Sequence, residues 1–261
     1  MIDGLKAVVF DWAGTMIDFG SRAPVVALLR AFADAGVPID ECEARADMGL
    51  AKGEHIAAIL ATARVAAAWR AVHGAEPTAA DAARLLERIG PIMRDAARDT
   101  ATLIPGAADV VARLRAAGVR TGSCTGYTRA MMEDVLPRAA AQGYAPDHLV
   151  CAGETPSGRP SPLMLWANLI ALDAWPVTAC VKVDDAVAGI AEGRAAGVWT
   201  IGVAATGNAI GLDRGSLEAL DAAERQRRIE AATAELRAAG AHEVVDSVAD
   251  LPAALVRLPI G

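Results

Sequence analysis

Paired cysteines, basic clusters and long apolar runs are scarce in this chain of 261 residues. The four cysteines lie far apart with no C-x-x-C pair, which argues against a disulfide framework or a zinc site. We therefore expect buried thiols at Cys42, Cys124, Cys151 and Cys180. The basic residues are scattered singly and the formal net charge is −7, so no nucleic-acid surface is expected.

The most apolar stretch, Ile56 to Val72, is rich in alanine and is interrupted by Arg64 and Arg70. It falls short of the run of about 20 apolar residues that a membrane span requires, and we expect a packed helix. The N-terminal residues show no charged region, long apolar region or cleavage site of a secretory signal. The expectation is a cytoplasmic protein with no membrane partner.

Hydrophobic residues make up 54% of the chain, which is enough to bury a core for one large domain or two unequal ones. Helical patterns at 107–117, 129–142, 161–172 and 186–196 alternate with strand-like runs, which lie at 6–10, 119–124, 148–152, 178–183, 198–203 and 243–245. Because most of these runs are apolar on both faces, an α/β fold is predicted, with a parallel sheet covered on both faces.

Residues 21–100 break this alternation with helical stretches and no convincing strand. Pro77-Thr78-x-x-Asp81 is typical of a helix start, and Pro105-Gly106 marks the return to the alternating pattern. The predicted organisation is a core domain of residues 1–20 and 101–261, with a helical insert of residues 21–100. Residues 216–239 predict one further long helix, packed on the sheet.

Polar residues follow four of the predicted strands, at the edge where parallel α/β sheets bind ligands. They are Asp11, then Thr125, Gly126 and Tyr127, then Arg159, and finally Asp184 and Asp185. Taken singly, each fits an ordinary turn, helix cap or surface position. Together they favour a site for a phosphate group and a divalent cation.

The oxygen ligands of Asp11 and Asp185 suit Mg²⁺, which prefers a few carboxylates with waters and phosphate oxygens. Backbone N–H groups and a guanidinium could hold the phosphoryl oxygens, the former around Gly14, Thr15 and Gly126 and the latter at Arg159.

This arrangement resembles the four motifs of the haloacid dehalogenase superfamily: Asp11-x-x-Gly14-Thr15, Thr125-Gly126, Arg159 and Asp184-Asp185. The resemblance implies a Rossmann-like, doubly wound parallel sheet and an all-helical C1-type cap inserted after the first strand. It also implies Mg²⁺ and an aspartyl-phosphate intermediate. Asp11 would be the nucleophile, Thr125 would bind the phosphoryl group, Arg159 would be the basic residue and Asp185 would hold the metal.

Position 13 departs from the usual phosphatase pattern of this superfamily, which has a second aspartate two residues after the nucleophile as general acid and base. Ala13 can transfer no proton. Three explanations stay open: a catalytically dead site, a leaving group activated in another way, or a proton carrier from elsewhere in the chain.

The segment DMGLAKGEHI, residues 47–56, places Met48, Lys52 and His55 at i, i+4 and i+7, on one side of a helix if it is helical. Lys52 could form an imine if desolvation or a nearby cation lowered its pKa. A lysine in this setting also fits a solvated helix face.

Together with DWAGTMIDFGSRAP, TGYTRAMM, GRPSP and EGRAAGVWTIGV, this segment resembles the phosphonoacetaldehyde hydrolases, the phosphonatases of the same superfamily. The resemblance implies a Lys52 Schiff base with the substrate aldehyde and attack of Asp11 on phosphorus. It implies metal contact from the backbone carbonyl of Ala13, and supporting roles for Met48, His55 and Tyr127. It also implies a small phosphonate substrate and a homodimer joined through the caps.

Such chemistry would explain Ala13. Displacement at phosphorus would expel a carbanion, whereas an iminium group accepts the electrons of the C–P bond and the fragment leaves as an enamine. No ester oxygen then needs a proton. Since Lys52 and Asp11 lie in different predicted domains, turnover would need the cap closed, with hinges near residues 20–24 and 102–106.

The metal motif departs from the expected G-D-x-x-x-D, because the chain has Asp184 before Asp185 and Gly189 where a second acid is expected. Asp184 either compensates as a further ligand or crowds the site with negative charge. Two alternative functions stay open: a phosphatase acting on a small phosphomonoester, for which Lys52 is dispensable, and a catalytically silent binding protein of the same fold.

Overall fold

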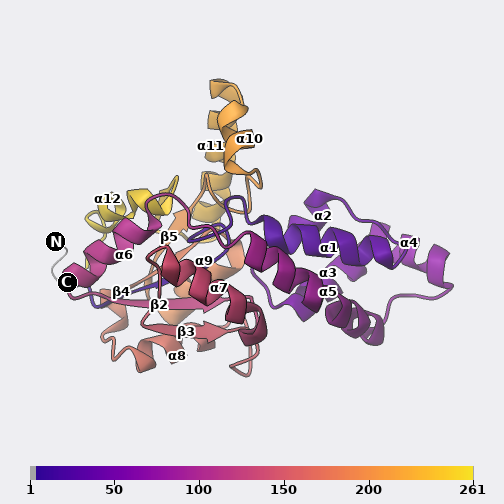
Figure 1. Ribbon diagram of the computed structural model, residues 1–261, viewed down its shortest axis with the longest axis horizontal. Coiled ribbons are helices and arrows are strands. Elements are labelled where there is room, and N and C mark those ends of the chain that lie inside the picture. Colours follow the sequence, from indigo (N-terminus) through magenta and orange to yellow (C-terminus); the bar gives the residue numbers. More distant parts are fainter. Residues whose placement is uncertain (1–3, 261) are drawn as a thin grey trace.

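A six-stranded parallel sheet forms the centre of the molecule in the computed structural model, which describes residues 4–260 (Figure 1). The strand order is β3-β2-β1-β4-β5-β6. The strands are β1 (Ala7–Phe10), β2 (Arg120–Thr125), β3 (His148–Cys151), β4 (Cys180–Asp184), β5 (Trp199–Val203) and β6 (Glu243–Val245). Each lies within two residues of its predicted range, so the α/β prediction is confirmed.

Alternate residues of the central strand β1 face two different helical layers. Val8 and Phe10 belong to the apolar cluster formed with α6 (Ala107–Ala116), α7 (Arg129–Ala141) and α12 (Leu251–Leu255). Ala7 and Val9 pack with α8 (Leu163–Ala171), beside which lies α9 (Val187–Ala196). Burial on both faces explains why this strand is apolar throughout.

The first five of the six helices between β1 and β2 form the cap, which extends from one side of the sheet (Figure 1). They are α1 (Arg22–Asp34), α2 (Glu41–Arg45), α3 (Lys52–Ala61), α4 (Ala63–His73) and α5 (Ala79–Asp99). The predicted start of α5 is confirmed, because Thr78 and Asp81 form a reciprocal capping box. The two connections to the core lie side by side, with Ile17 bridged to Leu103.

The expected single helix over Ile56 to Val72 is wrong: α3 and α4 meet at Thr62 with a bend of 83°. The Thr62 hydroxyl donates to the carbonyl of Ile59 at 2.8 Å, a local bond that competes with helix continuation. Within residues 4–260, no single helix is long and apolar enough to cross a membrane, and only this bent pair meets the length and composition together.

The expected single helix over residues 216–239 is also wrong. The chain forms α10 (Arg214–Ala219) and α11 (Ala222–Ala238), because the Asp221 carboxylate accepts from the N–H of Glu224 and starts a new helix. The later part of α11, with Ala232 and Leu236 buried, packs against β5 and β6 as predicted, whereas α10 and the start of α11 project away from the sheet (Figure 1). One cysteine prediction also fails, since Cys42 is exposed.

Candidate active site

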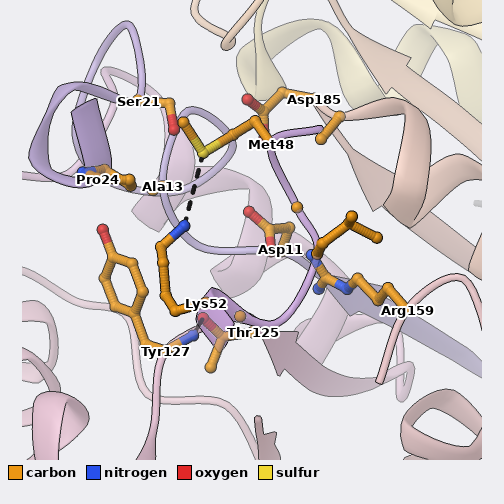
Figure 2. A pocket seen from close by; sticks show the side chains of 14 residues that line it. Asp11, Ala13, Ser21, Pro24, Met48, Lys52, Thr125, Tyr127, Arg159 and Asp185 are labelled. Atoms are coloured by element: carbon orange, nitrogen blue, oxygen red, sulfur yellow. Dashed lines mark hydrogen bonds and ion pairs between the residues drawn. The ribbon is translucent and has the colours of Figure 1, made fainter. Parts of the chain in front are cut away.

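A pocket lies where the carboxyl ends of the strands meet the cap (Figure 2). The core contributes Asp11, Ala13, Thr125, Gly126, Tyr127, Arg159, Asp185 and Ala186 to its lining, and the segment from the hinge into the cap contributes Ser21, Pro24, Met48, Gly49, Leu50 and Lys52. Most of the predicted site residues are thus brought to one place. Of the others, His55 lies behind Lys52, while Gly14, Thr15 and Asp184 lie beneath the pocket.

Lys52 is the first residue of α3 and is 7% exposed. Its side chain enters the pocket between Tyr127 and Asp11 (Figure 2). Its Nζ lies 3.8 Å from the sulfur of Met48 and 3.4 Å from Nδ1 of His55. Burial lowers the pKa of Lys52 to about 8, against a smaller opposing effect of Asp11. The solvated helix face is therefore excluded, and the amine has the desolvated environment that nucleophilic lysines need.

The predicted helical spacing does not explain the contact between Met48 and Lys52. Helix α2 ends at Arg45 and α3 begins at Lys52, so Met48 lies in a turn between them. The left-handed backbone of Gly49, with φ of 98°, lets this turn carry the sulfur back over the amine. His55 does share α3 with Lys52, one turn further along.

His55 is fully buried. Burial, and then the charge of Lys52, lower the pKa of His55 to about 3. The imidazole beside the amine is therefore neutral at physiological pH, so it adds no second positive charge to this part of the cap.

Asp11 follows β1, the strand at which the chain order reverses, where open α/β sheets bind ligands. Its Oδ1 lies 2.8 Å from Nη1 of Arg159. Burial, and then the neighbouring Asp184, raise the pKa of Asp11 to about 6, while Arg159 acts in the opposite direction. Arg159 is held by the carbonyl of Cys124, at 2.6 Å from Nη2.

Asp11, Asp184 and Asp185 gather so closely that ligand oxygens of all three lie within 4.8 Å of one another. Asp185 accepts from the hydroxyl of Thr15 at 3.0 Å and from the N–H of Asn208 at 2.8 Å. Burial, and then the two other acids, raise the pKa of Asp185 well above its ordinary value. A set of converging carboxylate oxygens is suited to a divalent cation.

Gly14 makes this approach possible. Its φ is +81°, and a Cβ at this position would lie 2.3 Å from Oδ2 of Asp185. Its N–H donates to the carbonyl of Ile17 at 2.8 Å, and the N–H of Thr15 points to the carbonyl of Trp12 at 3.2 Å. Since both N–H groups serve the turn, the geometry favours a role for Gly14 and Thr15 in positioning Asp185 over the predicted role in binding phosphoryl oxygens.

Thr125 and Tyr127 form the floor of the pocket on the β2 side. The hydroxyl oxygen of Thr125 accepts from the N–H of Tyr127 at 3.1 Å. Tyr127 is 3% exposed, and its hydroxyl has no hydrogen-bond partner among residues 4–260. Burial raises the pKa of Tyr127 well above its ordinary value, so the phenol keeps its proton and is a donor for a bound ligand.

A second layer of buried charge, which was not predicted from the sequence, lies behind Asp11 and Arg159. Lys182 in β4 and Glu192 in α9 are both fully buried, and the Lys182 amine lies 3.2 Å from Glu192 Oε2 and 3.1 Å from Asp184 Oδ2. Glu192 Oε2 also lies 3.1 Å from Nε of Arg159. A lysine within an otherwise apolar central strand is the sequence signal that could have revealed this layer.

The charges of the two layers do not cancel. Four carboxylates face two cations, which leaves a formal charge of −2: Asp11, Asp184, Asp185 and Glu192 against Arg159 and Lys182. Burying uncompensated charge is costly, and one divalent cation would balance this group.

Asp184 and Gly189 depend on each other. Asp184 Oδ2 pairs with Lys182, and its Oδ1 accepts from the N–H of Ala186 at 3.0 Å. A Cβ at position 189 would lie 1.9 Å from Asp184 Oδ2. The carboxylate of Asp184 therefore occupies the space that any side chain at position 189 would need, so the two departures from the expected motif are one structural change.

The parallel sheet, the helical cap after β1 and the aspartate at the switch point define a class of hydrolase. A family model described as haloacid dehalogenase-like hydrolase matches residues 5–197. The core and the cap are therefore those of an enzyme of this class.

Individual relatives narrow the assignment. The phosphonoacetaldehyde hydrolase of Paraburkholderia xenovorans is 47% identical over 247 residues, covering 95% of this chain and 92% of that protein. That of Pseudomonas aeruginosa PAO1 is 41% identical, covering 95% and 90%. The crystal structure of a phosphonoacetaldehyde hydrolase-like protein from Oleispira antarctica, 40% identical, superposes with a TM-score of 0.97, covering 98% of this chain and 93% of that one. The chain belongs to the phosphonoacetaldehyde hydrolase family.

Proposed function

We propose that the protein hydrolyses the C–P bond of phosphonoacetaldehyde to acetaldehyde and phosphate, with Lys52 and Asp11 as the two covalent catalysts. One observation carries this proposal: a buried amine from the cap and a buried carboxylate from the core line the same pocket, in a chain that belongs to the phosphonoacetaldehyde hydrolase family. We retain the division into a core of residues 1–20 and 101–261 and a cap of residues 21–100.

The first step is imine formation at Lys52. With a pKa of about 8, roughly a tenth of this amine is neutral at pH 7, against about one in 2,500 for an ordinary lysine. The neutral amine adds to the aldehyde carbon, and loss of water gives a protonated imine. The phenol of Tyr127, which has no hydrogen-bond partner among residues 4–260, would donate a hydrogen bond to the aldehyde oxygen.

The second step is transfer of phosphorus to Asp11. A carboxylate oxygen of Asp11 forms the new bond to phosphorus as the C–P bond breaks, and the electron pair of that bond moves into the iminium to leave an enamine on Lys52. Arg159 orients Asp11 from 2.8 Å. Because the leaving atom is carbon, an acid at position 13 has no oxygen to protonate, which accounts for Ala13.

Two hydrolyses complete the cycle. Water attacks the aspartyl phosphate and releases inorganic phosphate with Asp11 restored. The enamine takes up a proton at carbon to become the iminium, and a second water releases acetaldehyde and the Lys52 amine. The Thr125 hydroxyl, on the pocket floor, would hold a phosphoryl oxygen through these steps.

Mg²⁺ fits the acidic end of the pocket, because the three converging carboxylates and the formal charge of −2 call for a divalent cation with oxygen ligands. Asp11, Asp185 and the backbone carbonyl of Ala13 would hold it, with Asp184 as an additional candidate. When bound, it would offset the negative charge of the phosphonate as Asp11 approaches. Homodimerisation through the cap stays a prediction from the family resemblance.

A product assay tests this function. The protein is incubated with phosphonoacetaldehyde and Mg²⁺, and phosphate and acetaldehyde are both measured, with the Lys52→Arg variant and a panel of small phosphomonoesters in parallel. Equal amounts of the two products from the wild type, and neither from the variant, are expected. Phosphate release from esters that survives Lys52→Arg would favour the phosphatase, and no product from any substrate would favour the silent binding protein.

A further inference from the structure

Arg45, the last residue of α2, directs its guanidinium out of the cap and onto the core. Its Nη1 lies 3.0 Å from the carbonyl oxygen of Gly20 and 3.1 Å from Oδ1 of Asn208, and its Nη2 lies 2.8 Å from the carbonyl oxygen of Gly211. The ion pair within its own helix, with Glu41, is longer at 3.7 Å. The guanidinium therefore joins the hinge at Gly20 to the loop that follows β5.

The loop after β5 is shaped around this side chain. Gly211 has a φ of +71°, and a Cβ there would lie 2.5 Å from Nε of Arg45. Asn208 returns a bond from its Nδ2 to the carbonyl oxygen of Arg45 at 3.4 Å. The Arg45 side chain is only 13% exposed. A fit that needs glycine in the left-handed region is more specific than an incidental surface contact.

The same loop holds the carboxylate of Asp185. The backbone N–H of Asn208 donates to Asp185 Oδ2 at 2.8 Å. At Gly207, a Cβ would lie 2.6 Å from Cβ of Asp185, so the loop backbone lies directly on this residue. Asn208 is thus a partner of Arg45 through its side chain and of Asp185 through its main chain.

On the cap side, Arg45 leads into the turn that delivers the amine. The N–H of Met48 points to the carbonyl of Arg45 at 3.2 Å, and α3 begins at Lys52 four residues later. The turn lies against the core, since a Cβ at Gly49 would meet Cβ of Ala186 at 3.1 Å. Fixing Arg45 on the core therefore fixes the turn from which Lys52 enters the pocket.

We propose that Arg45 is a positioning residue that latches the closed cap onto the core and, through Asn208, sets the orientation of Asp185. The roles of Lys52 and Asp185 in this statement rest on the proposed function. A planar guanidinium reaches the oxygens of Gly20, Asn208 and Gly211 at once, which the compact ammonium of lysine does not. Cap opening removes the guanidinium from Asn208, so closure and the geometry of the acidic site are coupled.

The test compares Arg45→Met with Arg64→Met, a matched control. Arg64 is also a cap arginine, but it pairs with Glu43 and is half exposed. Amide hydrogen exchange without substrate is expected to accelerate in both residues 46–51 and residues 206–211 of Arg45→Met and in neither segment of the control. Calorimetry is expected to show a Kd for Mg²⁺ about tenfold weaker, the usual size of a lost outer-shell contact.

Two more variants separate a latch from a general loss of stability. Gly211→Ala keeps Arg45 but places a methyl group against its guanidinium, and is expected to give the same two effects. Asn208→Ala keeps the N–H to Asp185 but loses both side-chain bonds to Arg45, so adding it to Arg45→Met is expected to weaken Mg²⁺ binding little further.

Unchanged exchange in residues 206–211 of Arg45→Met, with Mg²⁺ affinity like that of the control, would overturn the latch even if activity fell. Additive losses in the Arg45→Met and Asn208→Ala double variant would also overturn it. Hydrogen exchange needs neither metal nor substrate, so it tests the Arg45 latch independently of catalysis. A wild type that does not cleave phosphonoacetaldehyde would overturn the proposed function but not the latch.

Discussion

The core side and the cap side of the pocket surround their ionisable groups differently. On the core side, Asp11 is paired with Arg159 at 2.8 Å, and a second buried layer of Lys182 and Glu192 supports that arginine. On the cap side, Lys52 has no ion pair among residues 4–260, and its neighbours are a thioether and a neutral imidazole. The core stabilises buried charged groups through ion pairs, whereas burial in the cap lowers the pKa of the Lys52 amine.

This difference matches the two proposed covalent roles. A carboxylate attacks phosphorus only when it is ionised, whereas an amine attacks an aldehyde only when it is neutral. Although burial raises the pKa of Asp11 to about 6, the carboxylate stays mostly ionised at pH 7, and burial lowers the pKa of Lys52 to about 8, so that a useful fraction of the amine is neutral at the same pH. Both groups are then available where the lobes meet. Substitution of Asp11 is therefore expected to leave imine formation at Lys52 intact.

The largest effect is expected from Asp11→Asn, which removes the proposed nucleophile of the core side. Phosphate release should fall by about 10⁴-fold or more, the usual scale for loss of a covalent nucleophile. Imine formation at Lys52 should persist, since it needs no carboxylate. Phosphate assay and borohydride trapping measure the two steps, with Asp34→Asn on the exposed surface of α1 as control. Loss of trapping together with phosphate release would show that the sides are not separable.

Lys52→Arg removes the amine proposed to form the imine on the cap side but keeps a positive charge. Cleavage of phosphonoacetaldehyde should fall by at least about 10³-fold, because no iminium forms to accept the C–P electrons. Lys6→Arg is the matched control, because Lys6 is exposed. Steady-state phosphate release measures the loss, and activity within tenfold of the wild type would contradict a role for the amine.

Moving the carboxylate from position 184 to position 189 tests whether the two positions share one space on the core side. Asp184→Gly alone should weaken Mg²⁺ about 10- to 100-fold, because it removes a carboxylate of the acidic group, and Gly189→Asp alone should weaken it through collision with Asp184. The double variant relieves the collision and should recover most of the affinity. Calorimetric titration with Mg²⁺ checks this, and a double variant weaker than both single ones would refute a shared space.

The smallest effect per step, about tenfold per pH unit, is expected in the pH profile. Since burial lowers the pKa of Lys52 to about 8, the neutral amine, and with it kcat/KM, should fall about tenfold per pH unit as pH drops below 8 and should level above it. Below about pH 6, protonation of Asp11 should steepen the fall. Rates of phosphate release from pH 5 to 9 measure the profile, and a constant kcat/KM between pH 6 and 8 would be inconsistent with a reactive neutral amine.

Local pattern was sufficient to predict much of this molecule. The six strands, the helical insert and the capping box of Thr78 and Asp81 depend on short-range propensity and apolar periodicity, and the structure confirms them. Asp11 and Asp185 could be predicted to lie close together, because the carboxyl ends of parallel strands meet at one edge of the sheet. These predictions needed no knowledge of distant contacts.

What the sequence did not reveal depends on such contacts. The pairing of Lys182 with Glu192 crosses from a strand to a helix, and Arg45 reaches a loop more than 160 positions away. The break at Thr62 depends on one hydroxyl that bonds to a nearby carbonyl. In the sequence, Asp184 and Gly189 are two separate departures from the expected motif. The structure shows that the Asp184 carboxylate occupies the space that a side chain at position 189 would need.

Borohydride trapping tests the division between amine and carboxylate most directly. The chain has three lysines, of which Lys6 is exposed, Lys182 is enclosed in the buried charged layer and Lys52 lines the pocket. After reduction in the presence of phosphonoacetaldehyde, peptide mass mapping should place a two-carbon adduct on Lys52 alone, retaining the phosphono group in Asp11→Asn. Full phosphate release with Lys52 unmodified would contradict the account.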